Sequence, residues 1–498
     1  MHMSEIIAGI RSVRGDVFKL VGGTTFSQVL GVLAVPILAR LYGPECFGVA
    51  ANFASIIGIL TVVACLRYEM AILLPKHSDE AANVFGISLA ATALTALLTG
   101  VVFMAVGDRI ADRMKVPGLE SYLWLIAPMV FLSGTFQALN YWNSRTRLYG
   151  RLAVARTVQV VIMNGSQIGF GFIATVSAGG LVWGVVLGTV AATTILAYQI
   201  WTDDAVLLRN SIQWKVISEG INRYRKFPLV DLWGGLLSVA SQQLPIILLG
   251  VFFSQATVGH YAIASRLIYL PMTLIGGAVG QVFFQRAAEA HAKREDLAGL
   301  TRDVFKGLVT LILLPSLLLT LIGKKVFVLI FGPNWAMAGE FVQIFGPWMF
   351  FWFVASPLTA IFAVMQRLEL ALAVHALLLV ARVAPLVIGG FYGGVYLTLT
   401  LYSLSGVVAY AVVGMWSMGL AGIAWSVYPI TLGRIALRSL PAAALVMVLD
   451  RWLKAPGWLV LLAGGVGLLE YTWRVARNDP EINRYVSAML GFLRRHAP

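Results

Sequence analysis

Residues 39–76 read ARLYGPECFGVAANFASIIGILTVVACLRYEMAILLPK, and this stretch decides the class of fold. Its apolar part, from Phe47 to Leu74, exceeds the about 20 residues that a helix needs to cross a bilayer. Two charges lie inside it, Arg67 and Glu69, and each costs roughly 3 kcal/mol in hydrocarbon. Side chains at positions i and i+2 of a helix diverge, so Glu69 is not expected to face Arg67. The stretch therefore predicts a membrane-spanning helix whose charges meet a polar interior or other partners.

The composition of the whole chain indicates a membrane protein. Hydrophobic residues make up 59% and charged residues 12% of the 498 residues, whereas a soluble domain carries about 25% charged residues. The apolar runs are longer than about 20 residues, which indicates helices and not the roughly ten-residue strands of a membrane barrel. The net charge of +14 comes from Lys and Arg in short loops between these runs. Membrane topology produces this pattern, so we predict an all-α integral membrane protein with no nucleic-acid partner.

About 14 apolar runs are candidate membrane spans. They cover residues 18–40, 47–74, 82–106, 121–143, 152–175, 178–201, 228–253, 257–284, 304–323, 340–365, 368–392, 395–417, 435–452 and 457–473. If the N-terminus is cytoplasmic, the segments on that side hold 25 of the 37 basic residues and the opposite loops hold 8. Lys and Arg are enriched in cytoplasmic loops, so both termini are predicted to be cytoplasmic.

A long polar stretch, 202–227, divides the first twelve spans into six and six. Leu207 and Ile217 recur there at helical spacing among Arg and Lys, which is typical of a helix lying in the membrane interface. We expect four parts: a six-helix bundle over 1–201, a cytoplasmic interfacial linker over 202–227, a second six-helix bundle over 228–418, and two further spans with a cytoplasmic amphipathic tail over 419–498.

The two halves carry related motifs at equivalent places. GPECFGVA, residues 43–50, follows the first span, and SQATVGHY, residues 254–261, follows the seventh at an offset of 211 residues. Because six spans is an even number, the two repeats have the same orientation in the membrane. Transporters built from such repeats bind their substrates between the halves, near the bilayer midplane.

Several motifs resemble the polysaccharide-transporter family of lipid-linked oligosaccharide flippases, which belongs to the multidrug/oligosaccharidyl-lipid/polysaccharide exporter superfamily. They are GPECFG (43–48), RYEMAILLPK (67–76), LNYWNSRTRLYGRLAVAR (139–156), FGPNWAMAGEFVQIFGPWMFF (331–351) and SPLTAIF (356–362). The resemblance implies two six-helix bundles in a V shape and alternating access. It also implies that the chain moves a polyprenyl-pyrophosphate-linked oligosaccharide across the bacterial inner membrane, from the cytoplasmic to the periplasmic leaflet, for exopolysaccharide or O-antigen biosynthesis. Membrane lipids are expected partners, and a polysaccharide polymerase and glycosyltransferases are further candidates.

The spans contain groups that suit such a substrate. An anionic pyrophosphate favours Arg, whose planar guanidinium donates two parallel hydrogen bonds, and sugar hydroxyls favour amides. The candidate substrate-binding residues are Arg67, Arg156, Arg266, Arg382, Gln137, Asn140, Gln159, Asn164, Gln242 and Asp231. Arg156 and Arg67 lie near the cytoplasmic face, where a long side chain can instead snorkel to water. Asp231 is expected to neutralise an arginine, with the binding of a coupling proton as the alternative.

Other functions remain as alternatives. A lipid II flippase of the same superfamily also takes an anion, whereas a multidrug or cation antiporter needs acidic groups in its cavity. A membrane glycosyltransferase is a remote alternative, because the sequence shows no clustered carboxylates and no metal-spaced His or Cys. We therefore expect no enzyme activity, no catalytic or metal-binding residues and no cofactor, and leave open coupling to an ion gradient.

Overall fold

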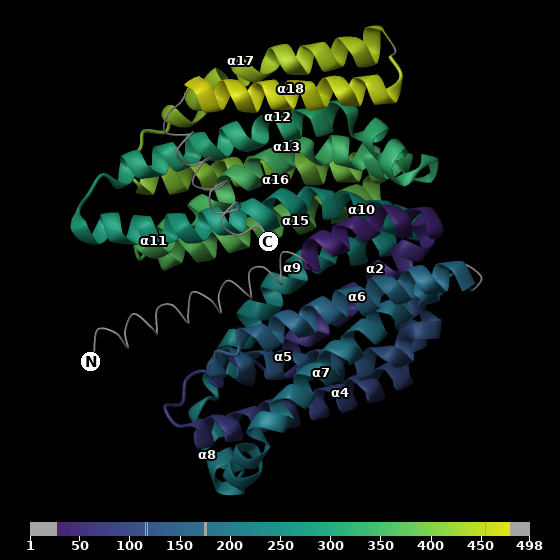
Figure 1. Ribbon diagram of the computed structural model, residues 1–498, viewed down its shortest axis with the longest axis vertical. Helices are drawn as coiled ribbons and strands as arrows, with labels where there is room; N and C mark the ends of the chain where they lie inside the picture. The colour runs from purple at the N-terminus through teal and green to yellow at the C-terminus, as the bar shows by residue number, and fades with distance from the viewer. Residues whose placement is uncertain (1–26, 115, 117, 174–176, 454, 479–498) are drawn as a thin grey trace. The chain divides into compact units, whose positions relative to one another are not determined.

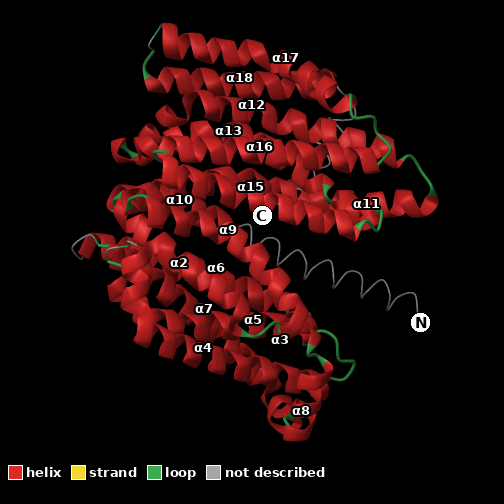
Figure 2. Cartoon of the chain, turned by 180° about the vertical axis from the view of Figure 1, so that it is seen from behind, coloured by secondary structure: helices red, strands yellow, loops and turns green. Residues whose placement is uncertain are grey.

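The computed structural model describes residues 27–478 apart from 115, 117, 174–176 and 454. Over these residues the chain forms helices joined by short loops, and no strand occurs (Figure 2). The described residues belong to two compact units that meet in the chain at Gly259 and His260. The predicted all-α class is therefore confirmed.

The first unit contains an apolar helix at Ser27–Leu41 and ten further helices (Figure 1). These are α2 (Pro44–Ala64), α3 (Tyr68–Ala71), α4 (Ser78–Met114), η1 (Glu120–Leu125), α5 (Ile126–Thr146), α6 (Tyr149–Ile173), α7 (Ala178–Ser211), α8 (Trp214–Arg223), η2 (Phe227–Asp231) and α9 (Leu232–Phe252). Helix α9 packs against α2 and so belongs to this unit, although the sequence assigned it to the second bundle. The predicted domain boundaries at 202, 228 and 419 stay predictions.

The second unit is formed by the remaining helices. They are α10 (Gln255–Pro271, which begins in the first unit), η3 (Met272–Gly276), α11 (Gly277–Lys293), α12 (Leu297–Phe331), η4 (Pro333–Trp335), α13 (Ala336–Leu358), α14 (Ala360–Val364), α15 (Leu368–Tyr392), α16 (Val395–Leu420), α17 (Val427–Met447), η5 (Val448–Trp452) and α18 (Gly457–Asn478). Helices α12, α13, α16 and α15 pack in that order, and α17 and α18 both pack on α12 (Figure 1). The final pair is thus joined to the unit through an apolar contact that includes Ile322, Val446 and Val460.

The protein is a multi-pass membrane protein. Ten described helices are long and apolar enough to cross a bilayer, and eleven if the bent pair Val427–Leu437 and Ser439–Trp452 forms one span. The apolar helices Ser27–Leu41 and Gly457–Tyr471 are shorter, and α6 occupies the predicted fifth span without meeting the same criteria. The exact number of 14 spans stays a prediction, and the predicted amphipathic tail beyond residue 478 lies outside the described residues.

The second predicted span is not one helix, and in this respect the sequence interpretation is wrong. Helix α2 ends at Ala64, and α3 begins at Tyr68. Between them Leu66 and Arg67 have φ angles of 49° and 66°, in the left-handed region that costs a residue with a Cβ roughly 1–2 kcal/mol. Helical periodicity carries no signal for such a break. The chain turns there, and the side chains of Arg67 and Glu69 no longer diverge.

The repeated motifs meet at a close backbone crossing inside the first unit. A Cβ atom added to Gly48 would lie 2.0 Å from the carbonyl oxygen of Gln255, and one added to Gly259 would lie 1.8 Å from that of Pro44. At the offset of 211 residues, Gly48 corresponds to Gly259 and Pro44 to Gln255. The two contacts are thus reciprocal. Only glycine permits this approach at either position.

The predicted linker is helical and docks on the start of α4. Its first ten residues extend α7 to Ser211, and its remainder contains α8. The Asn83 amide donates to the Ser211 carbonyl at 2.7 Å, and the backbone N–H of Gln213 donates to Asn83 Oδ1 at 2.9 Å. Leu207 and Ile217 pack against the apolar cluster between α4, α5 and α7. The segment is therefore part of the first unit.

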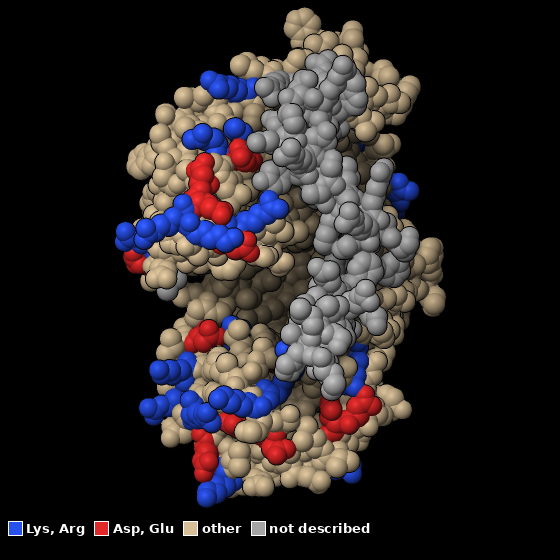
Figure 3. Space-filling view, turned by 60° about the vertical axis from the view of Figure 1, so that its left-hand side comes forward, with Lys and Arg blue, Asp and Glu red and all other residues tan. Residues whose placement is uncertain are grey.

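Charged side chains gather at one end of each unit. Figure 3 shows Lys and Arg, with Asp and Glu among them, over α8 in the first unit and over the α11–α12 turn in the second. In the first unit, loops that the sequence places on the cytoplasmic side contact one another: Arg145 donates to the carbonyl of His77 at 3.2 Å, and Arg223 pairs with Glu80 at 2.5 Å. On the opposite side of the second unit, Lys324 pairs with Glu340 at 2.6 Å and Lys325 with Asp450 at 2.6 Å.

Candidate functional site

The candidate charges fall into two groups, one in each unit. Arg67, Asp231 and Gln137 meet in the first unit beside the break between α2 and α3. Arg266 and Arg382 lie in the second unit, on α10 and α15.

Arg67 is held by the residue that the sequence expected to neutralise an arginine. Its Nε donates to Asp231 Oδ2 at 2.7 Å. Asp231 is the last residue of η2, a π-helical turn over Phe227–Asp231 that opens α9. The Asp231 side chain is 45% exposed and that of Arg67 is 17% exposed. The pair thus joins the α2–α3 break to the start of α9, with the Asp231 side chain partly exposed.

Glu69 completes this cluster, although the sequence interpretation separated it from Arg67. The residue is fully buried, and its Oε1 lies 3.8 Å from Arg67 Nη1. Gln137 Nε2 of α5 donates to the same oxygen at 3.2 Å, whereas Oε2 has no hydrogen-bond partner among residues 27–478 as far as the structure describes them. Burial raises the pKa of the Glu69 carboxyl to about 7, while the nearby Arg67 acts in the opposite direction. We call Arg67, Glu69, Gln137 and Asp231 the Arg67 cluster.

The other amides of the first unit have different surroundings. Asn140 on α5 and Gln159 on α6 are half-buried, whereas Asn164 on α6 is buried, and its Nδ2 has no hydrogen-bond partner in the described part of the chain. Gln242 on α9 is exposed and donates to the carbonyl of Ser238 at 3.2 Å. These residues do not form a single site with the Arg67 cluster. Of the predicted amides, only Gln137 contacts it.

Arg156 on α6 is half-buried. It makes no hydrogen bond and no ion pair with any other described residue. A membrane arginine is costly without a partner, so it marks either a ligand site or a snorkelling anchor. The structure leaves its charge available for a ligand or for water.

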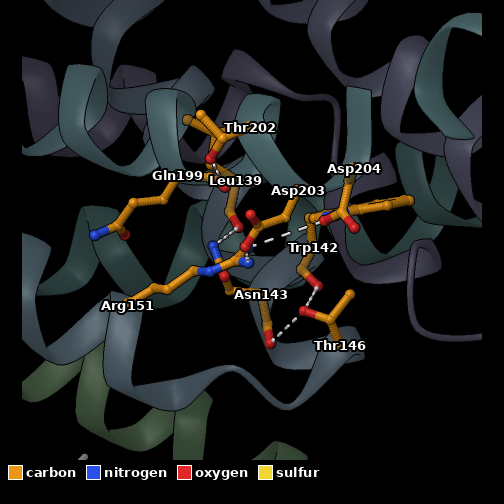
Figure 4. A network of polar contacts seen from close by, with 9 residues as sticks. All are labelled: Leu139, Trp142, Asn143, Thr146, Arg151, Gln199, Thr202, Asp203 and Asp204. Carbon is orange, nitrogen blue, oxygen red and sulfur yellow. Dashed lines mark hydrogen bonds and ion pairs between the residues drawn. The ribbon is translucent and has the colours of Figure 1, made fainter. Parts of the chain in front are cut away.

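A second polar network, which the sequence interpretation missed, ties α5, α6 and α7 together (Figure 4). Arg151 at the start of α6 forms an ion pair with Asp203 and lies 4.0 Å from Asp204. The indole of Trp142 on α5 donates to Asp204 Oδ2 at 2.9 Å. The signal for this network was present in the motif LNYWNSRTRLYGRLAVAR, but its acidic partners lie more than fifty residues later in the chain. It holds three helix ends in place and contacts none of the predicted site residues.

In the second unit, Arg382 lies among tyrosines. Its Nη2 donates to the Tyr410 hydroxyl of α16 at 3.1 Å, and Tyr402 of α16 and Tyr269 of α10 lie close enough to interact with its charge. Tyr269 in turn meets Trp352 of α13 edge to face, with ring centroids 5.0 Å apart. The Tyr410 hydroxyl thus orients the Arg382 guanidinium, with the two other tyrosines beside it.

Arg266 differs from Arg382 because it is exposed. It forms no ion pair or hydrogen bond with another described residue. Its helix α10 also carries Tyr269 one turn further on, so the two side chains lie on one face. Arg382 of α15 interacts with Tyr269, and Arg266 lies one turn before Tyr269 on the same helix. Among the described residues, no group of His, Cys, Asp and Glu has the arrangement that a metal ion needs.

Comparison with known proteins supplies a family and a fold. A model of the family described as polysaccharide biosynthesis protein matches residues 37–340. No curated protein matches the chain by sequence.

Among solved structures, the chain is similar to the lipid II flippase MurJ in an inward closed conformation. The identity is 11% and the TM-score is 0.73, over 92% of this chain and 99% of that chain. It is also similar to a multidrug resistance MATE family transporter of the MOP superfamily. The inward-facing form gives 16% identity and a TM-score of 0.61 over 81% of this chain and 98% of that one. The outward-facing form gives 17% identity and a TM-score of 0.51 over 82% of this chain and 94% of that one. At these identities the likeness shows a shared fold.

Proposed function

The chain belongs to the polysaccharide biosynthesis protein family, and from this premise we propose that it is a flippase for a polyprenyl-pyrophosphate-linked oligosaccharide. It moves the substrate from the cytoplasmic to the periplasmic leaflet of the bacterial inner membrane by alternating access, for exopolysaccharide or O-antigen biosynthesis. In this proposal the chain is a transporter and not an enzyme, and both of its termini are cytoplasmic. A polymerase and glycosyltransferases are candidate partners because they use the same lipid-linked sugars.

One observation carries the proposal: arginines in membrane helices lack carboxylate partners. Arg156 and Arg266 form no ion pair with any described residue. Arg266 lies in a helix long and apolar enough to cross the bilayer, and Arg156 lies in α6, at the predicted fifth span. Charges in such helices are costly and mark ligand pathways. A cation-binding antiporter would need the opposite sign of charge at these places. The pattern therefore supports an anionic substrate, and pyrophosphate matches the guanidinium fork.

The proposed head-group contacts are made by Arg266 and Arg382. The Tyr410 hydroxyl orients the Arg382 guanidinium, and Arg266 is exposed one helical turn before Tyr269. The amides Asn140, Gln159, Asn164 and Gln242 are proposed to meet sugar hydroxyls, and the polyprenyl tail remains in the lipid.

Surface-polysaccharide output in a deletion strain tests the function. Arg266→Ala and Arg382→Ala should reduce export by roughly tenfold or more, since a hydrogen bond to a charged group contributes about 1.5–3 kcal/mol. Arg→Lys at either position keeps the charge but loses the fork, so export should be partly retained. Arg156→Ala should cost less than either. Membrane protein is quantified alongside every variant.

A matched control is Arg286→Ala, since Arg286 is exposed in the middle of α11 and its replacement should not affect export. Normal export by both Arg266→Ala and Arg382→Ala, at normal protein levels, would contradict the cationic site. Growth rescue of a strain depleted of its lipid II flippase would instead assign lipid II as the substrate.

A further inference from the structure

The Arg67 cluster contains two carboxylates and one cation. Arg67 Nε contacts Asp231 Oδ2 at 2.7 Å, while its Nη1 lies 3.8 Å from Glu69 Oε1. The nearer carboxylate is half-exposed, and the farther one is fully buried, with one oxygen that has no hydrogen-bond partner among the described residues. At this geometry the single guanidinium contacts Asp231 at hydrogen-bond distance and compensates the charge of Glu69 only from 3.8 Å. A buried carboxylate in that position favours its protonated form.

The groups around Glu69 reinforce this asymmetry. Helix α3 packs against α4, α5 and η2. From η2 comes the negative charge of Asp231, and from α5 come the Tyr141 phenol and the Gln137 amide. The Cys65 thiol lies nearby and is held by Thr92 of α4 at 3.2 Å. Arg67 is the only cation acting on Glu69 among the described residues.

The backbone on both sides of the ion pair is irregular. Arg67 is left-handed, with a φ angle of 66°, as is Leu66 before it. Asp231 ends a π-helical turn, a feature that often marks functional positions in helices. At both places the α-helical hydrogen bonds are replaced by others, such as the bond from the Tyr68 N–H to the Cys65 carbonyl at 3.0 Å and that from the Leu232 N–H to the Phe227 carbonyl. A movement of Nη1 by roughly 1 Å would bring it within the about 2.8 Å of a charge-assisted hydrogen bond to Glu69.

We propose that Glu69 is a reversible proton-binding site whose occupancy decides which carboxylate holds Arg67. With the proton bound to a carboxyl oxygen of Glu69, Arg67 pairs with Asp231, as in this structure. When the proton leaves to water, the new carboxylate attracts Arg67 Nη1, and the contact between Arg67 and Asp231 weakens. Release of the proton from Glu69 thereby weakens the contact that links the α2–α3 break to α9.

This inference does not rest on the proposed function, because proton binding is measured without a transported substrate. It also differs from the sequence expectation, which considered Asp231 for a coupling proton. Asp231 is half-exposed and directly paired with Arg67, whereas Glu69 is fully buried. Burial places the pKa of Glu69 at about 7, where both of its forms occur near neutral pH.

The test is an infrared titration of the purified full-length protein in lipid nanodiscs. The carbonyl stretch of one protonated carboxylic acid should disappear as the pH rises through about 7. Glu69→Gln, which has the same shape and no proton to lose, should abolish this signal. The matched control is Glu45→Gln, since Glu45 is exposed and its replacement should leave the signal unchanged.

Two partner variants should move the titration in opposite directions. Arg67→Gln removes the cation and should raise the midpoint by about one pH unit or more, and Asp231→Asn removes a negative charge and releases Arg67, so it should lower the midpoint by a similar amount. If Arg67→Gln does not elute as a folded protein, Arg67→Lys replaces it. Lys keeps the positive charge but places it differently, so the titration midpoint should rise by less than in Arg67→Gln.

Persistence of the signal in Glu69→Gln would overturn the assignment. So would shifts of the same sign in the Arg67 and Asp231 variants, since burial alone would then account for the titration. Absence of any protonated carboxyl signal in the wild-type protein near neutral pH would also exclude the site.

Discussion

Replacing Gly48 by Ala should drive apart the two repeated motifs where they cross. The added Cβ would lie 2.0 Å from the carbonyl oxygen and 2.7 Å from the carbonyl carbon of Gln255. Ordinary carbon contacts need about 3.5 Å or more, so the two backbones would have to separate by more than an ångström. Neither side can rotate out of the way, because the atoms belong to the main chain.

The expected cost follows from two opposing terms. Overpacking a close contact costs about 1–3 kcal/mol, and a main-chain clash belongs at the upper end of that range. Ala gains up to about 1 kcal/mol over Gly in a helix. We therefore expect Gly48→Ala to lower the free energy of unfolding by about 2 kcal/mol. Gly259→Ala should do the same, since its Cβ would lie 1.8 Å from the carbonyl oxygen of Pro44.

The assay is equilibrium unfolding in mixed micelles of increasing sodium dodecyl sulfate content, followed by circular dichroism. Gly86→Ala and Gly165→Ala are matched controls, since both lie in helices and a Cβ there would meet nothing within 4 Å. Both controls should be neutral or slightly stabilising. The double variant Gly48→Ala/Gly259→Ala should lose less than the sum of the single losses, because the first methyl already opens the shared crossing. Equal stability of Gly48→Ala and Gly86→Ala would refute this reasoning.

Three further predictions concern other parts of the chain. Glu69→Gln should be more stable than the wild-type protein above about pH 7, and the two should be equally stable at about pH 5. The raised pKa of Glu69 stabilises the folded wild-type protein at low pH, and this stabilisation is lost as the pH rises through about 7. Unfolding midpoints of the two proteins that run parallel across this pH range would contradict the prediction. Trp142→Phe should lower the free energy of unfolding by about 1–2 kcal/mol, because Asp204 loses the indole donor at 2.9 Å, while Trp124→Phe, whose ring nitrogen bonds at an exposed site, should change it by less than about 0.5 kcal/mol. Replacing Leu207 and Ile217 by Ser should reduce the amount of protein in the membrane without changing which glycan is exported, since both pack on the first unit's apolar cluster; an altered glycan at unchanged protein level would mean that the segment reads the substrate.

The helices were largely predictable because apolar length is recorded directly in the sequence. Each predicted span overlaps a helix in the described part of the chain, and the pairing of Gly48 with Gly259 was visible as a repeat before its reciprocal contact was known. The pairing of Asp231 with an arginine was also expected, although its partner was not identified. These features depend on spacing along the chain or on the cost of an unpaired charge.

The break at Leu66 and Arg67 was not predictable in the same way. Neither of these two residues is Gly or Pro. Their left-handed conformation accompanies a contact between residues distant in sequence, Arg67 with Asp231. The contact between Arg67 and Glu69 was excluded on the assumption of a continuous helix. The network around Arg151 was missed because charges in loops look alike until their partners are placed.

The most direct test of the central claim is translocation by the purified protein in proteoliposomes. A polyprenyl-pyrophosphate-linked oligosaccharide is placed in one leaflet, and its appearance in the other is followed with a sugar-specific probe that does not cross the membrane. We expect the wild-type protein to accelerate this movement, Arg266→Ala to reduce the rate by roughly tenfold or more, and Arg286→Ala to leave it unchanged. An equal rate for protein-free and wild-type vesicles would contradict the account, as would an Arg266→Ala rate equal to that of the wild type.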